Sequence, residues 1–365
     1  MSVIAKKGIN MSVFSHKEFQ NHEQVSFFNC PHSGLRAIIA VHSTRLGPAL
    51  GGCRMWAYES DEQALRDVLR LSTGMTYKAA VAGLPLGGGK SVIIGDSKKT
   101  KTPELMRAMG RAVETFNGKY IIAEDVGTAV DDMNQIYTQT KHVVGIGEGS
   151  GDPSPTTAFG VYKGLKAAVL YRLHRSDLSG LKVAVQGLGN VGYNLCKLLA
   201  KVGVKLFVTD MQRERVDQAV KELGATAVGL NEIYTQDVDV FAPCALGAIL
   251  NDNTIKTIKA RVVAGAANNQ LAEPRHGLML RDAKILYAPD YVINAGGLIS
   301  VYYEQLARST GKTYDRAEAM VCVDKIEDTL ESVFRRADQD DIPTSLAADR
   351  VAEQRIGTGP TSKAA

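Results

Sequence analysis

Apolar and polar positions in the first third of the chain follow two different periods. Residues 61–75 place apolar side chains at helical spacing, on one stripe made of Ala64, Leu65, Val68, Leu71 and Met75. Short apolar runs rich in β-branched residues predict strands instead, at 35–44, 90–96 and 119–125. A second helix is predicted to begin at Pro103, with Thr102 as its N-cap. This part of the chain therefore mixes strands and helices.

The pattern becomes regular after residues 145–156, which are rich in glycine, proline and serine and predict a linker. Beyond this linker, apolar runs predict strands at 182–186, 205–210, 225–229, 238–243, 261–266 and 284–289. Helical spacers separate most of these strands, and repeated β–α units form a parallel, doubly wound sheet. Further helices are predicted at 315–337 and 345–356, the second with Thr344 as its N-cap.

One glycine-rich segment has the order that a dinucleotide-binding site requires. A strand ends at Gln186, and an amphipathic helix follows after a G-x-G-x-x-G motif. The motif's glycines are Gly187, Gly189 and Gly192. The first glycine permits a tight turn, the second lets a pyrophosphate approach the backbone, and the third allows helix and strand to pack closely. The helix amides then hold the diphosphate, since the N-terminal end of a helix favours negative charge.

We expect Asp210 to determine whether the site binds NAD or NADP. It ends the strand after the glycine motif, where a carboxylate binds both hydroxyls of the adenosine ribose and repels a 2′-phosphate. This position favours NAD over NADP. Arg213 is close in sequence, and an arginine can instead accommodate such a phosphate.

A second glycine-rich segment, GLPLGGGKS at 83–91, resembles a phosphate-binding loop but fails its spacing. The motif G-x-x-x-x-G-K-[ST] would place its first glycine at Leu84, and Gly83 stands one position too early. A helix should also follow, whereas the apolar run that starts at Lys90 predicts a strand. The sequence therefore argues against a nucleotide phosphotransferase built on this loop.

Lys90 then needs another explanation. Glycines before it let the backbone pass close to another group and leave room for a ligand. Desolvation disfavours the charged form of a lysine, so that it can act as a general base near neutral pH. Lys78 and the acids Glu124 and Asp125 stand in nearby segments. Together they suit a site in which one cation binds a substrate carboxylate, the other exchanges protons and an acid relays them. From these residues alone, solvated lysines and a helix-capping aspartate are the simpler interpretation.

Composition sets the broad class of the protein. The chain has 365 residues, which suits two domains, and a net charge of +4 from scattered basic residues, so nucleic-acid binding is not indicated. Five cysteines without a C-x-x-C pair indicate reduced thiols and no metal site. The sequence shows no signal peptide, and no run approaches the roughly 18 apolar residues of a membrane span. We expect a cytoplasmic protein with no membrane partner.

Seven segments of the chain, in the same order along the sequence, resemble the motifs of a known family. They are residues 46–56, 74–96, 123–128, 187–192, 243–251, 264–271 and 287–297. By these segments, essentially the whole chain resembles the amino-acid dehydrogenases of the Glu/Leu/Phe/Val superfamily, most closely the leucine dehydrogenases. The resemblance implies NAD-dependent, reversible oxidative deamination of an L-amino acid to a 2-oxo acid and ammonia. It also implies a homo-oligomer, either an octamer or a dimer.

The expected fold class is α/β, with an N-terminal mixed α/β substrate-binding domain, a doubly wound Rossmann NAD-binding domain and a cleft between them. We expect residues 1–147 to form the substrate-binding and oligomerisation domain and residues 148–336 the Rossmann domain. Residues 337–365, a C-terminal helix and tail, are expected to return to the first domain. Closure over the substrate would exclude water, with one hinge near 145–156.

The resemblance also implies roles for individual residues. Lys90 matches the catalytic lysine, Asp125 its partner in proton transfer, and Lys78 the lysine that binds the substrate carboxylate. Gly51 matches a backbone position at that carboxylate, and Asn269 an asparagine near the substrate amino group and the nicotinamide. The positions that match cofactor contacts are Gly187, Gly189, Asn190, Val191, Gly192, Asp210, Thr157, Ala245, Leu246 and Asn268. No metal ligand is implied.

By the same resemblance, apolar residues line the side-chain pocket, namely Leu50, Ala123, Leu298 and Val301. A glutamate side chain would need a cation there, because an unpaired buried carboxylate is costly. Ala123 and Val301 narrow the pocket, which favours leucine, valine and isoleucine. A dehydrogenase for aromatic L-amino acids, phenylalanine or tryptophan, is the alternative with the same mechanism. A non-catalytic NAD-binding protein is a further alternative, which the intact lysines and aspartate disfavour.

We expect Ala123→Gly to widen this pocket and to raise activity on phenylalanine relative to leucine. The shift should be about tenfold, since one methylene in an apolar pocket is worth roughly 1–3 kcal/mol of discrimination. The measurement is the ratio of kcat/KM for the two amino acids. An unchanged ratio would show that Ala123 does not line the pocket.

Overall fold

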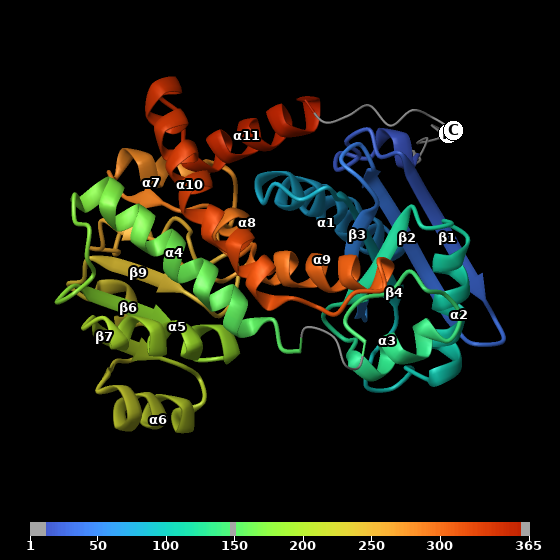
Figure 1. The fold of residues 1–365 in the computed structure, drawn as a ribbon, viewed down its shortest axis with the longest axis horizontal. Coiled ribbons are helices and arrows are strands. Elements are labelled where there is room, and N and C mark those ends of the chain that lie inside the picture. The colour runs from blue at the N-terminus through green and yellow to red at the C-terminus, as the bar shows by residue number, and fades with distance from the viewer. Residues whose placement is uncertain (1–11, 147–150, 359–365) are drawn as a thin grey trace, which may run out of the picture. The chain divides into compact units, whose positions relative to one another are not determined.

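The computed structural model describes residues 12–146 and 151–358, which divide into two compact units. The first unit contains residues 12–76 and 86–146, and the second contains residues 77–85 and 151–358. A short 3₁₀ helix, η1 (Val13–Ser15), opens the described chain. Figure 1 labels most of the helices and strands, coloured along the chain.

The first unit is built on a mixed five-stranded sheet with the order β1-β2-β4-β3-β5. Its strands are β1 (Gln24–Cys30), β2 (Leu35–Ser43), β3 (Ala49–Trp56), β4 (Gly87–Ile94) and β5 (Tyr120–Glu124). β2 pairs antiparallel with β1 and β4, whereas β3 pairs parallel with β4 and β5. The predicted strands at 35–44, 90–96 and 119–125 are confirmed as β2, β4 and β5. Polar residues in β1 and glycines in β3 interrupt the apolar pattern, so these strands were not predicted.

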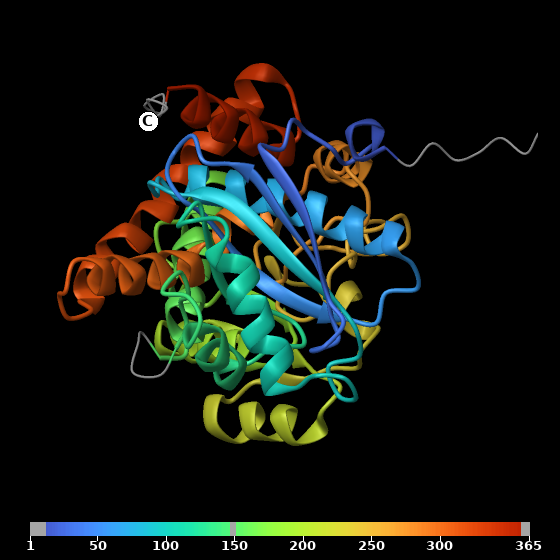
Figure 2. The ribbon, with the colours of Figure 1, turned by 90° about the vertical axis from the view of Figure 1, so that its right-hand side faces the viewer.

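Helices cover both faces of this sheet. Ile38 and Val92 pack against α1 (Asp61–Val81), whose buried stripe includes Val68. The next residues along the two strands, Ile39 and Ile93, belong to the core formed with α2 (Pro103–Glu114) and α3 (Val130–Tyr137). This alternation follows from the pleat of a strand, and Figure 2 shows α1 and α2 on opposite faces.

The N-cap that the sequence predicts for α2 is confirmed. Thr102 lies in extended backbone before Pro103, and its side chain accepts the Leu105 amide at 3.2 Å. The cap satisfies one of the amides that the first helical turn leaves without a partner.

The second unit contains a parallel six-stranded sheet with the order β11-β10-β9-β6-β7-β8. Its strands are β6 (Lys182–Gln186), β7 (Lys205–Thr209), β8 (Thr226–Ala227), β9 (Val240–Pro243), β10 (Val262–Val263) and β11 (Leu286–Tyr287). Each lies within a predicted apolar run. The order reverses beside β6, which is the topology of a doubly wound dinucleotide-binding sheet. The expected Rossmann architecture is therefore confirmed.

The helices of the second unit are α4 (Ser154–Leu173), α5 (Asn190–Lys201), α6 (Arg213–Leu223), α7 (Arg275–Asp282), α8 (Asp290–Ile293), α9 (Gly296–Ser309), α10 (Arg316–Asp340) and α11 (Thr344–Thr358), with a 3₁₀ turn η2 (Glu232–Thr235). The predicted helices at 315–337 and 345–356 are confirmed as α10 and α11. Thr344 lies inside α11, and its hydroxyl donates to the Tyr287 carbonyl at 2.6 Å, which fastens the helix to the end of β11.

The linker was predicted to extend to residue 156, but residues 154–156 form the first turn of α4. The first amides of a helix have no partner within the helix, so a proline, which lacks an amide hydrogen, is tolerated there. A Ser-Pro sequence is therefore compatible with a helix start as well as with a loop. Residues 147–150 of the predicted linker lie outside the described residues.

The C-terminal helices bear on the expected division of the chain. α10 runs across residue 337, and α11 packs against α7, α10 and β11 within the second unit. Residues 359–365 of the expected returning tail lie outside the described residues. The division into 1–147, 148–336 and 337–365 stays a prediction.

α11 brings a carboxylate into a partly buried acidic cluster. Asp349 accepts a hydrogen bond from the Tyr291 hydroxyl at 2.7 Å. Burial raises the pKa of Asp349 to about 6, and the charges of Glu353 and Asp290 add to this while the Tyr291 hydrogen bond opposes it. Folding therefore favours the protonated form of this carboxyl.

We expect Asp349→Asn to stabilise the protein more at pH 7.5 than at pH 4.5. A raised folded-state pKa contributes stability below the unfolded value of about 3.9, and this contribution is lost as the pH rises through about 6. The amide keeps an acceptor for Tyr291 without that loss. Urea unfolding should show that the free energy of unfolding of Asp349→Asn exceeds that of the unaltered protein by on the order of 1–3 kcal/mol at pH 7.5.

Asp328→Asn, which makes the same change at an exposed position of α10, is the control. Equal effects of Asp349→Asn at the two pH values would contradict the assignment.

Candidate active site

An ion pair between a buried lysine and a partly buried aspartate lies in the first unit. Lys90 in β4 is 6% exposed, and its Nζ lies 2.6 Å from Oδ2 of Asp125, the residue after β5. β3 runs between these two strands and contributes Gly52. A Cβ atom at Gly52 would lie 2.8 Å from the Cβ of Asp125 and 3.2 Å from Nζ of Lys90. The two predicted catalytic residues are thus brought together, and Gly52, which the sequence did not single out, leaves room for their contact.

The charge of Asp125 is stabilised by its surroundings. Burial raises its pKa, but the Lys90 ammonium and the Arg54 guanidinium more than offset this and hold the pKa below its ordinary value. The Asp125 amide donates to Oγ1 of Thr128 at 3.0 Å, and that hydroxyl donates to the Cys53 carbonyl at 2.9 Å. An ionised carboxylate is therefore fixed beside a lysine, which is an arrangement suited to proton transfer.

The glycines before Lys90 belong to β4 and let its neighbours approach. A Cβ at Gly88 would lie 2.0 Å from the Thr76 amide nitrogen, and one at Gly89 would lie 2.6 Å from the Tyr120 ring. These residues pair with β2 and β3, so the segment is a strand and not a phosphate-binding loop. The expected close approach of the backbone to another group is therefore confirmed. The expectation that these glycines also leave room for a ligand was wrong, because protein atoms fill the space where their side chains would lie.

Lys78 belongs to the second unit, in the last turn of α1. Its Nζ donates to Oδ1 of Asn294 at 2.7 Å, and Nδ2 of Asn294 donates to Oδ1 of Asn268 at 2.7 Å and to the Ala266 carbonyl at 3.0 Å. Asn294 is 4% exposed. Sequence reasoning missed Asn294, since a single asparagine between helices carries no periodic or charge signal. The structure makes it the link between Lys78 and the loop of Asn268.

α11 fixes the end of α1 on which Lys78 stands. The hydroxyl of Tyr77 donates to Glu353 at 3.1 Å. The Arg355 guanidinium donates to the carbonyls of Ala80, at 3.2 Å, and Val81. The Ala80 carbonyl also accepts the Gly83 amide at 3.0 Å in the turn that ends α1, and Arg355 adds a side-chain cap to this end of the helix.

The glycine motif of the second unit forms the predicted turn. β6 ends before Gly187, which has a φ of +96° and whose Cβ would lie 2.7 Å from that of Ala245. A Cβ at Gly192 would lie 2.0 Å from the Gly187 carbonyl oxygen. Asn190 and Val191 form the first turn of α5, where amides lack helical partners. This turn tolerates no side chain at either glycine.

Asp210 supports this turn directly. Its side chain is 10% exposed, and Oδ2 accepts the Leu188 amide at 2.6 Å. Arg213, which we considered as a partner for a 2′-phosphate, is paired with Asp217 at 2.9 Å. Arg215, which the sequence did not single out, is the cation beside Asp210, with Nη1 at 3.9 Å from Oδ2.

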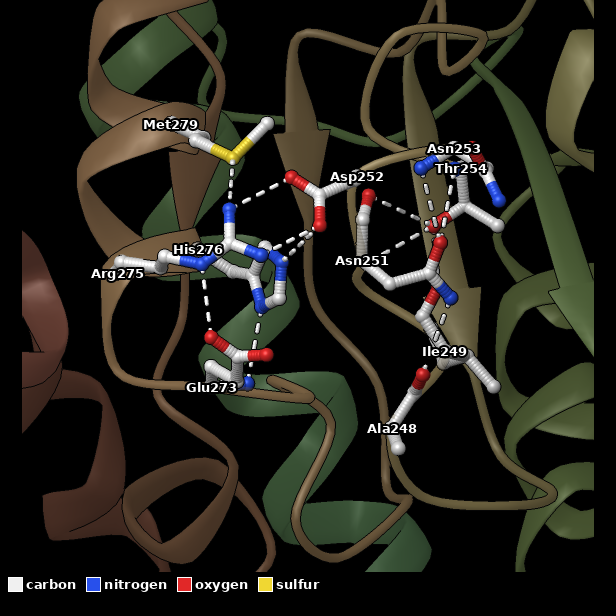
Figure 3. A network of polar contacts seen from close by, with 10 residues as sticks. All are labelled: Ala248, Ile249, Asn251, Asp252, Asn253, Thr254, Glu273, Arg275, His276 and Met279. Atoms are coloured by element: carbon white, nitrogen blue, oxygen red, sulfur yellow. Dashed lines mark hydrogen bonds and ion pairs between the residues drawn. The ribbon is translucent and has the colours of Figure 1, made fainter.

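The loop 244–252 follows β9 and contains Ala245 and Leu246. Figure 3 shows the polar network that fixes its far end. Asp252 accepts two hydrogen bonds from the Arg275 guanidinium, at 2.6 Å and 2.5 Å. The Arg275 hydrogen bond holds the pKa of Asp252 below its ordinary value. The network fastens the loop to the start of α7.

A second loop, which carries Asn268 and Asn269, pairs with this one. The Ala248 amide donates to the Asn269 carbonyl at 2.7 Å, and the Leu250 amide to the Gln270 carbonyl at 2.9 Å. Asn269 has a φ of +52°, a left-handed conformation that asparagine tolerates better than most residues. Two loops with predicted cofactor contacts are thus held together by backbone hydrogen bonds.

The remaining predicted residues are distributed over both units. Thr157 lies in the first turn of α4, where its hydroxyl donates to the Pro153 carbonyl at 3.0 Å. The Gly51 carbonyl in β3 accepts the Tyr120 hydroxyl at 2.9 Å. Of the predicted pocket residues, the first unit contains Leu50 and Ala123, and the second contains Leu298 and Val301. That they line one pocket stays a prediction.

Residues 12–146 and 151–358 contain no group of three or more His, Cys, Asp or Glu that is arranged to hold a metal ion. No helix in the same ranges has the length and apolarity that a membrane crossing requires. All five cysteines of the chain are free thiols.

Comparisons with known proteins cover most of the chain. Residues 22–142 match the family described as Glu/Leu/Phe/Val dehydrogenase, dimerisation domain. Residues 206–359 match the family described as Glutamate/Leucine/Phenylalanine/Valine dehydrogenase. A leucine dehydrogenase of Geobacillus stearothermophilus is 54% identical over 351 residues, which are 95% of this chain and 94% of that protein. An L-tryptophan dehydrogenase of Nostoc punctiforme is 49% identical over 354 residues, 97% of this chain and 98% of that one.

A solved structure agrees with the fold. The crystal structure of L-tryptophan dehydrogenase from Nostoc punctiforme has a TM-score of 0.83 and 48% sequence identity, and covers 93% of this chain and 97% of that chain. The resemblance drawn from the ordered sequence segments is therefore confirmed.

We expect Gly192→Ala to disrupt the turn after β6, because the added Cβ would lie 2.0 Å from the Gly187 carbonyl oxygen. Binding of NADH, followed by its fluorescence, should weaken by about tenfold or more, as overpacking costs roughly 1–3 kcal/mol. Gly74→Ala is the matched control, since its added Cβ meets nothing within 4 Å inside α1. Unchanged binding in Gly192→Ala would show that this turn does not hold the dinucleotide.

Proposed function

Because the chain belongs to the Glu/Leu/Phe/Val dehydrogenase family and is an amino-acid dehydrogenase, we propose that it deaminates branched-chain L-amino acids. The reaction is reversible and NAD-dependent, and it converts leucine, valine or isoleucine to the 2-oxo acid and ammonia. The observation that carries this proposal is the contact of 2.6 Å between the buried Lys90 and Asp125. A lysine in β4 and an ionised carboxylate at the end of β5 are fixed, across the intervening β3, where protons can be exchanged.

The proposed chemistry assigns each residue one task. Bound NAD would accept the hydride of the substrate α-carbon, which leaves an iminium. Lys90 assists the attack of water on the iminium carbon and takes up the released proton through Nζ, and Asp125 helps to move protons. The carbinolamine nitrogen then gains a proton and the hydroxyl group loses one, so that ammonia leaves and the 2-oxo acid remains.

Other residues would hold the substrate in place for these steps. Lys78 binds the substrate carboxylate, with the backbone at Gly51 as a second contact, and Asn269 lies at the amino group. Asn294 supports this proposal, since its hydrogen bond of 2.7 Å fixes the Lys78 ammonium. A charge-assisted contact with a fixed ammonium would give the carboxylate a defined orientation.

The residues of the second unit fit NAD as the cofactor. The glycine turn at Gly187 and Gly192 leaves backbone, without side chains, at the end of β6. Asp210 is fixed by the Leu188 amide, and a carboxylate at this position would bind the adenosine ribose and repel a 2′-phosphate. The further contacts expected from the resemblance are Gly189, Asn190, Val191, Thr157, Ala245, Leu246 and Asn268.

The choice of substrate rests on the pocket and on the relatives. Leu50, Ala123, Leu298 and Val301 offer no partner for a charged side chain. Leucine dehydrogenases are 51–54% identical to this chain, compared with 49% for the tryptophan dehydrogenase and 46% for a phenylalanine dehydrogenase. A branched aliphatic substrate is therefore favoured over an aromatic one.

The proposal extends to assembly and location. The matched dimerisation domain supports a homo-oligomer, for which an octamer or a dimer is expected. The partners are small molecules: the amino acid, the 2-oxo acid and ammonia. Free thiols suit the reducing cytoplasm, which is the location we propose.

The test is NADH formation with L-leucine, valine, isoleucine, methionine, phenylalanine, tryptophan, glutamate and alanine at alkaline pH. We expect the branched aliphatic substrates to give the highest kcat/KM. Turnover confined to phenylalanine or tryptophan would keep the mechanism and overturn the pocket assignment. No turnover of any substrate by protein that binds NADH would overturn the proposed activity.

Lys90→Ala tests the mechanism in the same assay. Its kcat should fall by at least about a hundredfold, since general acid–base catalysis contributes roughly 10²–10⁴-fold, while NADH binding is retained. Lys98→Ala, at an exposed lysine shortly after β4, is the control. A substantial residual rate in Lys90→Ala would remove Lys90 from the proton exchange.

A further inference from the structure

Asp125 has a second cationic partner besides Lys90. Its Oδ2 atom lies 2.6 Å from Nζ of Lys90 and 3.1 Å from Nε of Arg54 in β3. The side chains of Arg54 and Asp125 are 23% and 22% exposed, so water screens their contact only in part. Two cations therefore share one carboxylate oxygen.

Arg54 is itself held from helix α1. Its Nη1 lies 2.9 Å from Oδ2 of Asp67, and the Tyr58 hydroxyl donates to the same oxygen at 2.7 Å. The other oxygen of Asp67 lies 3.3 Å from Arg70. Arg54 thus bonds Asp67 and Asp125 through different nitrogens, which fixes the plane of its guanidinium.

This arrangement matters when Lys90 loses its charge. An arginine keeps its proton in proteins, whereas a lysine can exchange one. With Lys90 neutral and no second cation, the pKa of the partly buried Asp125 would rise, because burial disfavours the charged form of its carboxyl group. Arg54 stays charged throughout and keeps Oδ2 beside Lys90.

We propose that Arg54, held in place by Asp67, is a positioning residue that keeps Asp125 ionised and directed at Lys90 while Lys90 exchanges protons. The inference rests on the proposed deamination, which gives Lys90 that task. It adds to the site two residues for which neither the sequence pattern nor the resemblance provided a role.

Three groups with an O–H or S–H proton face Asp125, and they keep these protons up to strongly alkaline pH. The charged groups of the same cluster are Lys90, Arg54 and, beyond Arg54, Asp67. Burial raises the pKa of the Cys53 thiol to about 12. Burial also raises the pKa of the Tyr120 hydroxyl well above its usual value, and that of Tyr58. These three groups therefore do not give rise to the acidic limb of a pH–rate profile, which is the fall in rate toward low pH and depends on an ionised Asp125.

The experiment is the pH dependence of kcat and kcat/KM for leucine in Arg54→Gln. We expect kcat at neutral pH to fall by about tenfold or more, and the acidic limb to move up by about one pH unit, because a nearby cation is lost. KM should change by less than about threefold, as expected for an interaction that acts on the chemical step. Arg54→Lys restores the charge and should return the limb toward that of the unaltered enzyme.

Asp67→Asn tests the same link from the other side. It weakens the hold on Arg54 without changing a group that contacts Asp125. The loss of the Asp67 charge by itself would move the limb down, since a nearby like charge is removed. A shift of the limb upward, smaller than in Arg54→Gln, is therefore the expected sign of the lost hold on Arg54. This variant also keeps the proposal testable if Arg54→Gln does not fold.

Arg36→Gln is the matched control, because Arg36 in β2 pairs with Asp61 of α1 at 2.7 Å without contacting Asp125. It should leave the pH profile in place.

Two failures can be told apart. A limb that stays in place in both Arg54→Gln and Asp67→Asn, with a loss of thermal stability alone, would overturn the proposal and make Arg54 a structural link between β3 and α1. No leucine turnover by the unaltered protein would instead count against the proposed function.

Discussion

The candidate chemistry of the first unit depends on the close approach of three parallel strands around one ion pair, in which a buried lysine contacts a partly buried carboxylate. A lysine that is 6% exposed must be paired, since an isolated buried charge is costly. Asp125 pairs with it at 2.6 Å, and a side chain at Gly52 would occupy the space that this contact needs. Arg54, in β3, contributes a second positive charge beside the Asp125 carboxylate. The reactive group, its partner and the support of that partner therefore belong to one packed sheet.

The second unit fixes its functional groups in a different way. Here hydrogen bonds between loops replace the strand contacts: the loop 244–252 is bonded to the loop of Asn268 and Asn269, and Asn294 links that loop to Lys78. Helix α11 adds a cap on the end of α1. Each lysine with a proposed role is thus oriented by a specific oxygen acceptor, a carboxylate for Lys90 and an amide for Lys78. This difference suits a proton-exchanging group in one case and a fixed anion-binding charge in the other.

Glycine has two separate uses in this chain, and they explain why one glycine-rich segment misleads. Around Gly187 and Gly192 the backbone turns sharply between a strand and a helix, and one of these residues has a φ of +96°. Gly88 and Gly89 are strand residues whose missing side chains admit Thr76 and Tyr120. In both segments, glycines precede residues with a possible functional role. Only the first segment has a strand before it and a helix after it, which a nucleotide-binding turn requires.

The sequence by itself determined the elements with a regular pattern and the motif with a fixed order. The strands of the parallel sheet, helices α2, α10 and α11, and the turn from Gln186 to Gly192 follow from local periodicity, capping and glycine spacing. The motifs of the sequence were also sufficient to identify the family that the chain resembles. Only the tertiary structure decided that β1 and β3 are strands, that Gly52 makes room for the ion pair, and that Arg54, Asn294 and Arg215 stand beside functional groups. These residues act through partners distant in sequence, and such contacts leave no period or spacing in the chain because only folding brings the atoms together.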